Sequence, residues 1–525
     1  MESSWQRYSQ HLVRYTDLGV SLDISQMHFP KGHIEDQSTA CIRAYTYMRD
    51  LEAGAVANVD EDRMVGHYWL RDASLAPEKD NLGEEIRSYI GSCNQSILEF
   101  AKETHASGKF THLLVIGIGG SALGPQLIAD ALGSDADAMH VEFLDNTDPD
   151  GYARVLGNLS LDRTLSLVIS KSGGTKETAN GMEAAQAAYT AAGLKFAEHA
   201  AAVTGVGSKL DKIAKEAGWL KRFAMTGWVG GRTSVTSVVG LLPMALQGLD
   251  INAFLEGARL MDAHTRSDDT ADNAAMLMAL MWHFAGDGVG KKDMVILPYK
   301  DRLSLMAKYL QQLIMESLGK EHDLDGKIVE QGIAVYGNKG STDQHAYVQQ
   351  LRDGVNNFFA TFIEVRESFT DGRRESSRAG DYLQGFLRGT RRALSDKKRP
   401  SMTLSLSNVD ARSVGALIAL FERAVGYYAA LVNVNAYHQP GVEAGKVAAE
   451  AFIAFLQQTR AHLQASPGKA LAADDILPHL EPTESGETAT AEEVYHSLIH
   501  IAHNDPDVTL AQGDTPQEDT FTYQG

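Results

Sequence analysis

Short, continuously apolar runs alternate with amphipathic stretches from about residue 111 onward. The first run, HLLVIGI from His112, lacks polar alternation, as expected for a strand of a parallel sheet covered on both faces. A glycine turn and a helical stretch follow it, and similar runs recur as HVEFL from His140, TLSLVIS from Thr164 and AAAVT from Ala200. Strands that alternate with helices predict a doubly wound α/β domain, which we place at residues 106–250.

A second series of the same kind begins at DMVILP, from Asp293 to Pro298. It continues through FFATFIEV from Phe358 and SMTLSLS from Ser401, again with helical stretches between the runs. This repetition predicts a second α/β domain at residues 251–467 and suggests an internal duplication without close sequence identity. The fold class is therefore α/β, with two α/β/α sandwich domains built on parallel sheets.

The two ends of the chain have a different pattern. Residues 1–105 are mainly helical in their spacing of apolar positions, with polar interruptions such as Pro30-Lys31-Gly32. Residues 468–525 are acidic and polar, which predicts a helical extension with a loose end at GDTPQEDTFTYQG.

Composition narrows the class of protein. The 525 residues are 44% hydrophobic and 22% charged, with a formal net charge of −20, which disfavours nucleic acid and anionic membranes as partners. An anionic substrate would need a locally basic pocket. The two cysteines, the absence of an apolar secretion signal in MESSWQRYSQ and the short apolar runs favour a cytoplasmic protein. The longest such run, Met276 to Phe284, is interrupted by Trp282 and His283 and predicts a buried helix.

The glycine turn after the first strand allows more than one interpretation. Gly117-Ile-Gly119-Gly-Ser-Ala122 fits G-x-G-x-x-A, and Asp145 follows the next strand, as in a dinucleotide-binding unit. An NAD-dependent oxidoreductase is therefore one reading, and a tight turn without any ligand is another. The turn could also line a sugar phosphate.

The next strand-to-helix turn favours the sugar phosphate. The segment SKSGGTKET packs Lys171, two glycines and four hydroxyl side chains into nine residues; the hydroxyls are Ser170, Ser172, Thr175 and Thr178. Hydroxyls, free backbone N–H groups and a helix N-terminus together suit the several oxygens of a phosphate monoester. A Ser/Thr-rich helix cap is the simpler alternative, but one hydroxyl would suffice for that. No G-x-x-x-x-G-K-[ST] occurs, which argues against a P-loop nucleotidase.

Two further segments carry an arginine and a carboxylate. Arg232 follows a pair of glycines at a loop-to-helix junction, where it could place a fixed cation near an oxyanion. Lys308, Gln312 and Glu316 lie four apart on a predicted helix that ends near Gly319. At this end the helix dipole disfavours a negative charge, so Glu316 is a candidate carbon base. A surface arginine and a solvated Lys/Glu stripe are the plain alternatives.

Later segments supply a histidine, a lysine and a possible metal cluster. His345 falls in the first turn of a predicted helix after Ser341, Thr342 or Asp343, where the dipole helps to keep its ring neutral. Gln439 precedes a Pro-Gly helix entry, and Lys446 lies one to two turns inside that helix. Each of these side chains could equally be an ordinary surface residue. His496, His500 and His503 share a helix face after a Thr490/Glu493 capping box, but no H-E-x-x-H glutamate accompanies them, so we predict no metal.

Taken together, these segments resemble the glucose-6-phosphate isomerase family. Six motifs occur in the order of that family between about residues 115 and 450: IGIGGSALGP, SKSGGTKET, VGGRTSVTS, MESLGK, GSTDQHAYVQQ and QPGVEAGK. The resemblance implies two sugar-isomerase α/β domains, a hexose 6-phosphate substrate, a homodimer and chemistry without a cofactor or metal.

The resemblance also implies roles for single residues. Glu316 would shuttle a proton between C2 and C1 through an enediol, and Arg232 would stabilise the enediolate. His345, donated by the neighbouring subunit, and Lys446 would assist ring opening. The phosphate and sugar would contact residues of the two turns and two glutamines: Gly120, Ser121, Ser170, Lys171, Ser172, Thr175, Glu177, Thr178, Gln312 and Gln439.

Three positions depart from the pattern that is frequent in the family. Leu318 stands where Asn is frequent, Pro440 where Trp is frequent, and Gly173-Gly174 replaces bulkier residues in the phosphate loop. None of these changes removes a reactive group. A non-catalytic sugar-phosphate-binding module stays open as an alternative at this point, as does the less favoured NAD-dependent oxidoreductase.

Overall fold

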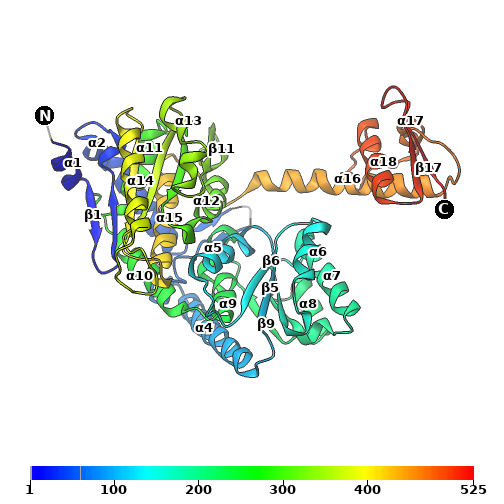
Figure 1. Ribbon diagram of the computed structural model, residues 1–525, viewed down its shortest axis with the longest axis horizontal. Helices are drawn as coiled ribbons and strands as arrows, with labels where there is room; N and C mark the ends of the chain where they lie inside the picture. Colours follow the sequence, from blue (N-terminus) through cyan, green and yellow to red (C-terminus); the bar gives the residue numbers. More distant parts are fainter. Residues whose placement is uncertain (1–2, 60) are drawn as a thin grey trace. The chain divides into compact units, whose positions relative to one another are not determined.

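The computed structural model describes residues 3–59 and 61–525, without the side chains of residues 442–444. The chain divides into two compact units, one ending at His438 and the other beginning at Gln439. Figure 1 shows the elements of both units, which are treated separately below.

The first sheet has five parallel strands in the order β6-β5-β7-β8-β9. Its strands are β5 (His112–Ile116), β6 (His140–Leu144), β7 (Thr164–Ser170), β8 (Ala200–Gly205) and β9 (Lys221–Met225). Four of them were predicted from apolar runs; β9, the charged edge strand KRFAM, was not. The central strand β7 is buried at every position, which explains its unbroken apolar pattern.

Helices cover both faces of this sheet (Figure 1). One face packs on α6 (Pro149–Gly157), α7 (Lys176–Ala191) and α8 (Lys209–Glu216). The other packs on α4 (Leu82–Ser107), α5 (Leu123–Leu132) and α9 (Val238–Gln247). This confirms the predicted α/β/α sandwich in the first half of the chain.

The second sheet has six strands in the order β1-β2-β15-β14-β10-β13. Strands β10 (Asp293–Pro298), β13 (Val335–Tyr336), β14 (Phe358–Val365) and β15 (Ser401–Leu406) are parallel. Strands β1 (Leu12–Tyr15) and β2 (Val20–Asp23) are antiparallel additions from the N-terminal segment. That segment was expected to be mainly helical, and it does contain the helices α1 (Ser4–Gln10), α2 (His33–Asp36), α3 (Ser38–Glu52) and α4. Its first strands were not predicted; they complete the distant second sheet, because Val20 and Leu22 bury their side chains against it.

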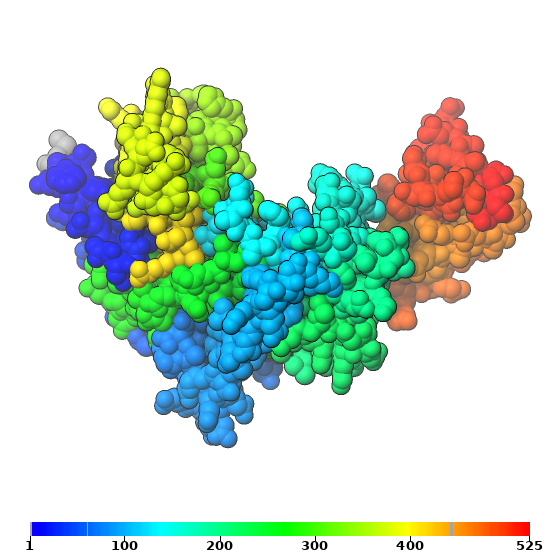
Figure 2. Space-filling model, turned by 60° about the horizontal axis from the view of Figure 1, so that its bottom comes forward, coloured from blue at the N-terminus to red at the C-terminus, as the bar shows by residue number. Residues whose placement is uncertain are grey.

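The first unit also contains further helices and two short hairpins. They are α10 (Ile251–Thr265), α11 (Ala274–Ala285), α12 (Met306–Leu310), α13 (Val348–Asp353), α14 (Arg378–Ser395) and α15 (Ala411–Leu431), with the hairpins β3 (Val56–Asn58)/β4 (Arg63–Met64) and β11 (Lys320–His322)/β12 (Ile328–Gln331). Helix α11 is the buried helix predicted around Met276. The N-terminal residues, blue in Figure 2, lie against α14, where Arg391 pairs with Asp23.

Helix α15 is the one helix among the described residues that is long and apolar enough to cross a membrane, and 89% of its most apolar window is buried. It packs against α3, α10 and α11. Its hydropathy is therefore that of a core helix.

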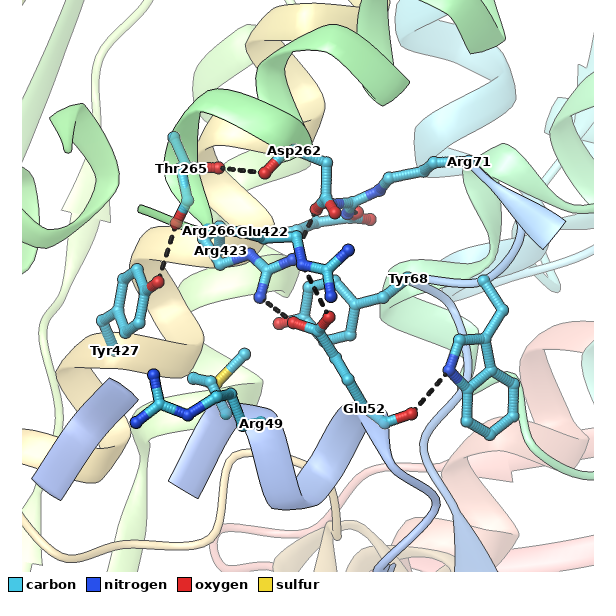
Figure 3. A network of polar contacts seen from close by, with 12 residues as sticks. Arg49, Glu52, Tyr68, Arg71, Asp262, Thr265, Arg266, Glu422, Arg423 and Tyr427 are labelled. Atoms are coloured by element: carbon cyan, nitrogen blue, oxygen red, sulfur yellow. Dashed lines mark hydrogen bonds and ion pairs between the residues drawn. The ribbon is translucent and has the colours of Figure 1, made fainter. Parts of the chain in front are cut away.

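A buried ionic network joins α15 to α10 and the N-terminal segment (Figure 3). Arg71 pairs with Glu422 and lies 2.5 Å from Asp262, while Arg423 pairs with Glu52 and lies 2.7 Å from the same Asp262. The side chains are nearly inaccessible to solvent. Because a buried charge is costly without a partner, these pairs hold together segments that are far apart in sequence.

The second unit has its own apolar core, around Phe521, Leu498 and Ile476. It consists of α16 (Pro440–Gln464), α17 (Ala473–Ile476), α18 (Ala491–Asn504), β16 (Val508–Ala511) and β17 (Thr520–Tyr523). The predicted loose end is wrong: β17 pairs with β16, and Phe521 is completely buried. The unit also begins at Gln439 rather than at residue 468, since α16 packs on α18.

Candidate active site

The hydroxyl-rich loop lies between the carboxyl end of β7 and α7, as predicted. Ser170 Oγ accepts the Gly173 N–H at 3.1 Å and donates to Thr175 Oγ1 at 3.2 Å. Ser172 Oγ accepts the Gly174 N–H at 3.1 Å. Thr175 is the N-cap residue of α7 but makes no side-chain cap bond, so the simple helix-cap alternative does not account for it.

Gly173 has a conformational reason for its place in this loop. Its φ is +67°, a region that favours glycine, and a Cβ there would lie 2.3 Å from the backbone nitrogen of Leu210 in α8. The glycine pair that departs from the family pattern therefore includes one position that this backbone requires.

Thr178 is the most unusual hydroxyl of the loop. The residue is 4% exposed, and its Oγ1 has no hydrogen-bond partner among the described residues. A cavity of ≈ 80 Å³ lies between this first turn of α7 and the start of α8, with Ser170, Thr175 and Thr178 in its wall. An unpaired buried hydroxyl costs free energy, which a ligand oxygen could offset.

Lys171 is tied to the neighbouring loop. Its Nζ donates to the carbonyls of Gly227 at 3.1 Å and Val229 at 3.2 Å, which leaves one N–H for a ligand. Burial, reinforced by the nearby Arg63, lowers the pKa of Lys171 to about 8. Glu177 lies half-buried in the first turn of α7.

The first glycine turn forms the short helix η3 (Gly119–Ser121) and contacts a second turn, η6 (Gly231–Thr236). A Cβ on Gly120 would lie 2.0 Å from the Gly231 carbonyl oxygen, and Ser234 Oγ donates to the Gly120 carbonyl. The Cα and the carbonyl of Gly120 therefore lie against η6, which restricts the approach of a pyrophosphate from that side. Asp145 is also occupied, since it accepts from Gln126 at 2.7 Å, so the dinucleotide interpretation is not favoured.

Arg232 belongs to η6, the turn that contacts η3, and it lies opposite Glu316. Nη1 of Arg232 lies 3.9 Å from Oε2 of Glu316, and neither atom has a hydrogen-bond partner among the described residues. Arg232 Nη2 donates to the His438 carbonyl at 3.0 Å, which fixes the guanidinium. Burial lowers the pKa of Arg232, and the Glu316 carboxylate opposes that shift. A fixed cation thus faces a carboxylate across a gap.

The helix that carries Glu316 was predicted from its sequence, but the part that holds Glu316 is a π-helix. Helix α12 continues into a π-helical segment, η8 (Gln311–Glu316), and ends at Leu318 before Gly319. Lys308 Nζ donates to Gln126 Oε1 at 3.2 Å, and the Gln312 amide lies beside Gly119. Lys308, Gln312 and Glu316 therefore share the side that faces the first domain, as their spacing predicted. Leu318, which replaces a frequent Asn, is fully buried.

Three predicted residues are not brought to this gap within the first unit. His345 is exposed in the 3-10 turn η9 (Thr342–His345) and makes no hydrogen bond or ion pair to a described residue. Asp343, not a helix cap, is buried and accepts from Asn338 and Tyr347. Gln439 and Lys446 belong to the C-terminal unit, where Gln439 precedes Pro440 at the start of α16.

Sequence reasoning missed the supports of the site. Thr204 Oγ1 donates to the Ser170 carbonyl at 2.6 Å and so fixes the end of β7. The Gly120–Gly231 contact was also missed, because nothing in either glycine pair indicates its partner.

The predicted Thr490 capping box is confirmed. Among the described residues, no group of three His, Cys, Asp or Glu side chains could hold a metal.

Comparison with known proteins identifies the family. The model of the family described as phosphoglucose isomerase matches residues 37–378 and 391–468 of this chain. The chain belongs to the phosphoglucose isomerase family. It is 52% identical over 535 residues to the glucose-6-phosphate isomerase of Geotalea daltonii, with 99% of each protein covered. The corresponding protein of Geobacter sulfurreducens is 54% identical over 513 residues, with 95% of each covered.

A solved member of the family has the same fold. The crystal structure of a glucose-6-phosphate isomerase from Chlamydia trachomatis matches with a TM-score of 0.79 and 27% identity. The match covers 86% of this chain and 91% of that one. The α/β fold described above, with its two largely parallel sheets, is therefore that of the family.

Proposed function

We propose that this chain catalyses the reversible isomerisation of glucose 6-phosphate and fructose 6-phosphate. The observation that carries the proposal is the approach of Arg232 Nη1 to Glu316 Oε2 at 3.9 Å, with neither atom hydrogen-bonded to a described residue. The near-full-length similarity to proteins named glucose-6-phosphate isomerase agrees with it. The reaction belongs to glycolysis and gluconeogenesis, and we propose a cytoplasmic location.

The phosphate end of the substrate would lie at the start of α7. Here the hydroxyls and free N–H groups of the loop, together with the positive end of the helix dipole, favour an anion. Binding this remote group supplies the free energy that positions the reacting carbons. The proposed phosphate ligands are Ser170, Lys171, Ser172, Thr175 and Thr178, with Glu177 beside them, while Gly120 and Ser121 line the sugar.

Glu316 would remove the proton from the carbon next to the carbonyl. Its carboxylate takes the C2 proton of the open-chain aldose and returns it to C1 of a cis-enediol, while O1 gains a proton and O2 gives up its hydroxyl proton, which yields the ketose. As the proton leaves, negative charge develops on the carbonyl oxygen. The buried Arg232 guanidinium is already fixed by the His438 carbonyl, so it would stabilise this charge without reorganisation. Such proton transfer requires no cofactor or metal.

Ring opening precedes this step, and we assign it to His345 and Lys446. Gln312 and Gln439 would contact the sugar hydroxyls. His345 would come from the partner of a homodimer, which agrees with its exposure and with its lack of a polar partner among the described residues. The hexose phosphate is the proposed small-molecule partner; no nucleic acid or membrane is proposed.

The decisive experiment is a coupled assay. Fructose 6-phosphate is supplied with glucose-6-phosphate dehydrogenase and NADP⁺, without added metal, and NADPH formation is followed. Turnover above a protein-free blank supports the proposal. Binding of fructose 6-phosphate without turnover would instead identify a non-catalytic sugar-phosphate-binding module.

A further inference from the structure

A second cavity lies in the second α/β domain, away from Arg232 and Glu316. Its volume is ≈ 630 Å³, and Tyr299, which follows β10, and Val365, at the end of β14, contribute to its wall. It therefore lies at the carboxyl edge of the second sheet, where open α/β sheets place their ligands. None of the residues assigned above to the isomerase site lines it.

Hydroxyl groups without partners line this cavity. Ser341 and Thr342 approach from one side, and Ser368 and Thr370 from the loop after β14. None of these four hydroxyls makes a side-chain hydrogen bond to a described residue, and all four residues are partly or fully accessible. They can therefore donate to a ligand without breaking an existing bond.

The long helix α14 begins at the same cavity. Ser377, its N-cap residue, accepts the Gly380 N–H at 3.3 Å, and the helix ladder starts with the Asp381 N–H. The N–H groups of Arg378 and Ala379 have no acceptor among the described residues, and Ala379 lines the cavity. An 18-residue helix thus directs free donors and its positive end at this space.

Two lysines add positive charge. Lys300 Nζ donates to the carbonyls of Glu367 at 3.1 Å and Ser368 at 2.8 Å, which leaves one N–H. Lys339 Nζ lies 3.0 Å from Asp301 at the rim. Arg302 also lines the cavity, but its Nη1 already donates to the carbonyls of Ala131 and Gly133, so we do not assign it as a ligand of the site. The carboxylates of Asp301 and Glu367 also line the cavity and balance these two lysines, so its distinguishing feature is the number of hydrogen-bond donors and not a net positive charge.

We propose that this cavity binds a phosphate monoester at a site separate from the substrate site. The donors match those of the first domain: four hydroxyls, a lysine and a helix N-terminus at the carboxyl end of a buried strand. Phe369 and Leu383 form an apolar side, so the ester carries an apolar or sugar portion in addition to its phosphate. The duplicated architecture supplies two phosphate cradles in one chain.

The location also links the site to the isomerase chemistry. Gly340, Ser341 and Thr342 line the cavity, and His345 ends the same short turn η9. A bound phosphate would contact the turn that presents His345 and so bias its position. This second step rests on the proposed function; binding itself does not.

Hydrogen exchange of the full-length protein with and without inorganic phosphate tests the binding. A Ser170→Ala/Thr178→Val double variant weakens the first cradle, so any remaining protection reports the second. We expect phosphate to slow amide exchange in residues 339–342 and 366–380 of both the wild type and this variant. Absence of slowing there, at phosphate concentrations that protect residues 170–178 of the wild type, would overturn the proposal.

A second variant checks which groups bind. Thr342→Val/Thr370→Val removes two hydroxyls with little change of shape, and it should lose protection at residues 339–342 and 366–380. It should keep the protection at residues 170–178, which also shows that it is folded. Persistence of the protection at residues 366–380 in this variant would reject the assigned ligands. Failure on either count leaves the coupled isomerase assay unaffected, so the two proposals can be judged separately.

Discussion

Nη1 of Arg232 and Oε2 of Glu316 face each other at 3.9 Å, too far for a hydrogen bond. Both atoms lack other hydrogen-bond partners among the described residues. The pair is held apart because Arg232 is fixed by the His438 carbonyl and Glu316 by the π-helical segment η8. A substrate oxygen bound between or beside these groups would meet a cation and a base at once.

Replacing Glu316 by Gln should remove the base while keeping its shape. We expect kcat to fall about 10³-fold with little change in KM, because the phosphate loop is untouched. Steady-state kinetics in the coupled assay measure both constants. Glu321→Gln, an exposed carboxylate a few residues later, is the matched control and should behave as wild type. Near-normal turnover of Glu316→Gln would reassign the base.

Gly120→Ala should disturb catalysis through the backbone. The new Cβ would lie 2.0 Å from the Gly231 carbonyl oxygen, so η6 must move and Arg232 with it. Since misplacement by about 1 Å can cost about 10²-fold, we expect kcat to fall by that order. Gly91→Ala is the control: a Cβ there meets no atom within 4 Å, so kcat should stay unchanged.

The sequence predicted the central strands and the position of the hydroxyl-rich loop well because these depend on local patterns. The run TLSLVIS is buried at every position, and the hydroxyls of SKSGGTKET lie where a strand ends and a helix begins. The order of the six motifs then indicated the family, which the family model confirms. The gap between Arg232 and Glu316 could not be predicted, because it depends on the contact of Gly120 with Gly231, more than one hundred positions away.

The errors have the same physical origin. Strands β1 and β2 were missed because their partner is β15, hundreds of residues later in the chain. The terminal FTY was taken for a loose end because its acidic surroundings conceal one buried side chain, Phe521. In both places a long-range contact decides the structure, and local composition does not reveal it.

Thr178→Val should separate stability from binding. The hydroxyl is buried without a partner among the described residues, so its replacement by a methyl group should stabilise the protein. We expect the unfolding free energy to rise by up to about 1 kcal/mol, and Tm to rise with it. The same change should raise KM, because a proposed phosphate ligand is lost. Thr190→Val in the same helix removes an exposed hydroxyl bonded to the Gln186 carbonyl and should change neither quantity appreciably. A fall in Tm for Thr178→Val would show that the hydroxyl has a partner in the free protein.

Arg71→Met should destabilise the first unit strongly. Arg71 is completely buried between Glu422 and Asp262, and its loss leaves the Glu422 carboxylate buried without its cation. Such a change costs about 3–5 kcal/mol. Arg259→Met removes a surface pair with Glu256 and should cost about 0–1 kcal/mol, as denaturant unfolding can measure. Equal costs for the two variants would mean that the buried network contributes no more than a surface pair.

Lys171 should give the enzyme an alkaline limit. Burial lowers the pKa of Lys171 to about 8, so the free protein loses this cation as pH rises through that value, and kcat/KM should fall. The effect of Lys171 on stability does not explain the fall. The folded pKa is below the unfolded value of 10.5, so between pH 8 and 10.5 the unfolded chain binds more protons and the Lys171 contribution to stability rises with pH. Lys171→Gln should have a low kcat/KM throughout and lack this limb, whereas Lys176→Gln, exposed at the start of α7, should retain it. An unchanged alkaline limb in Lys171→Gln would assign it to another group.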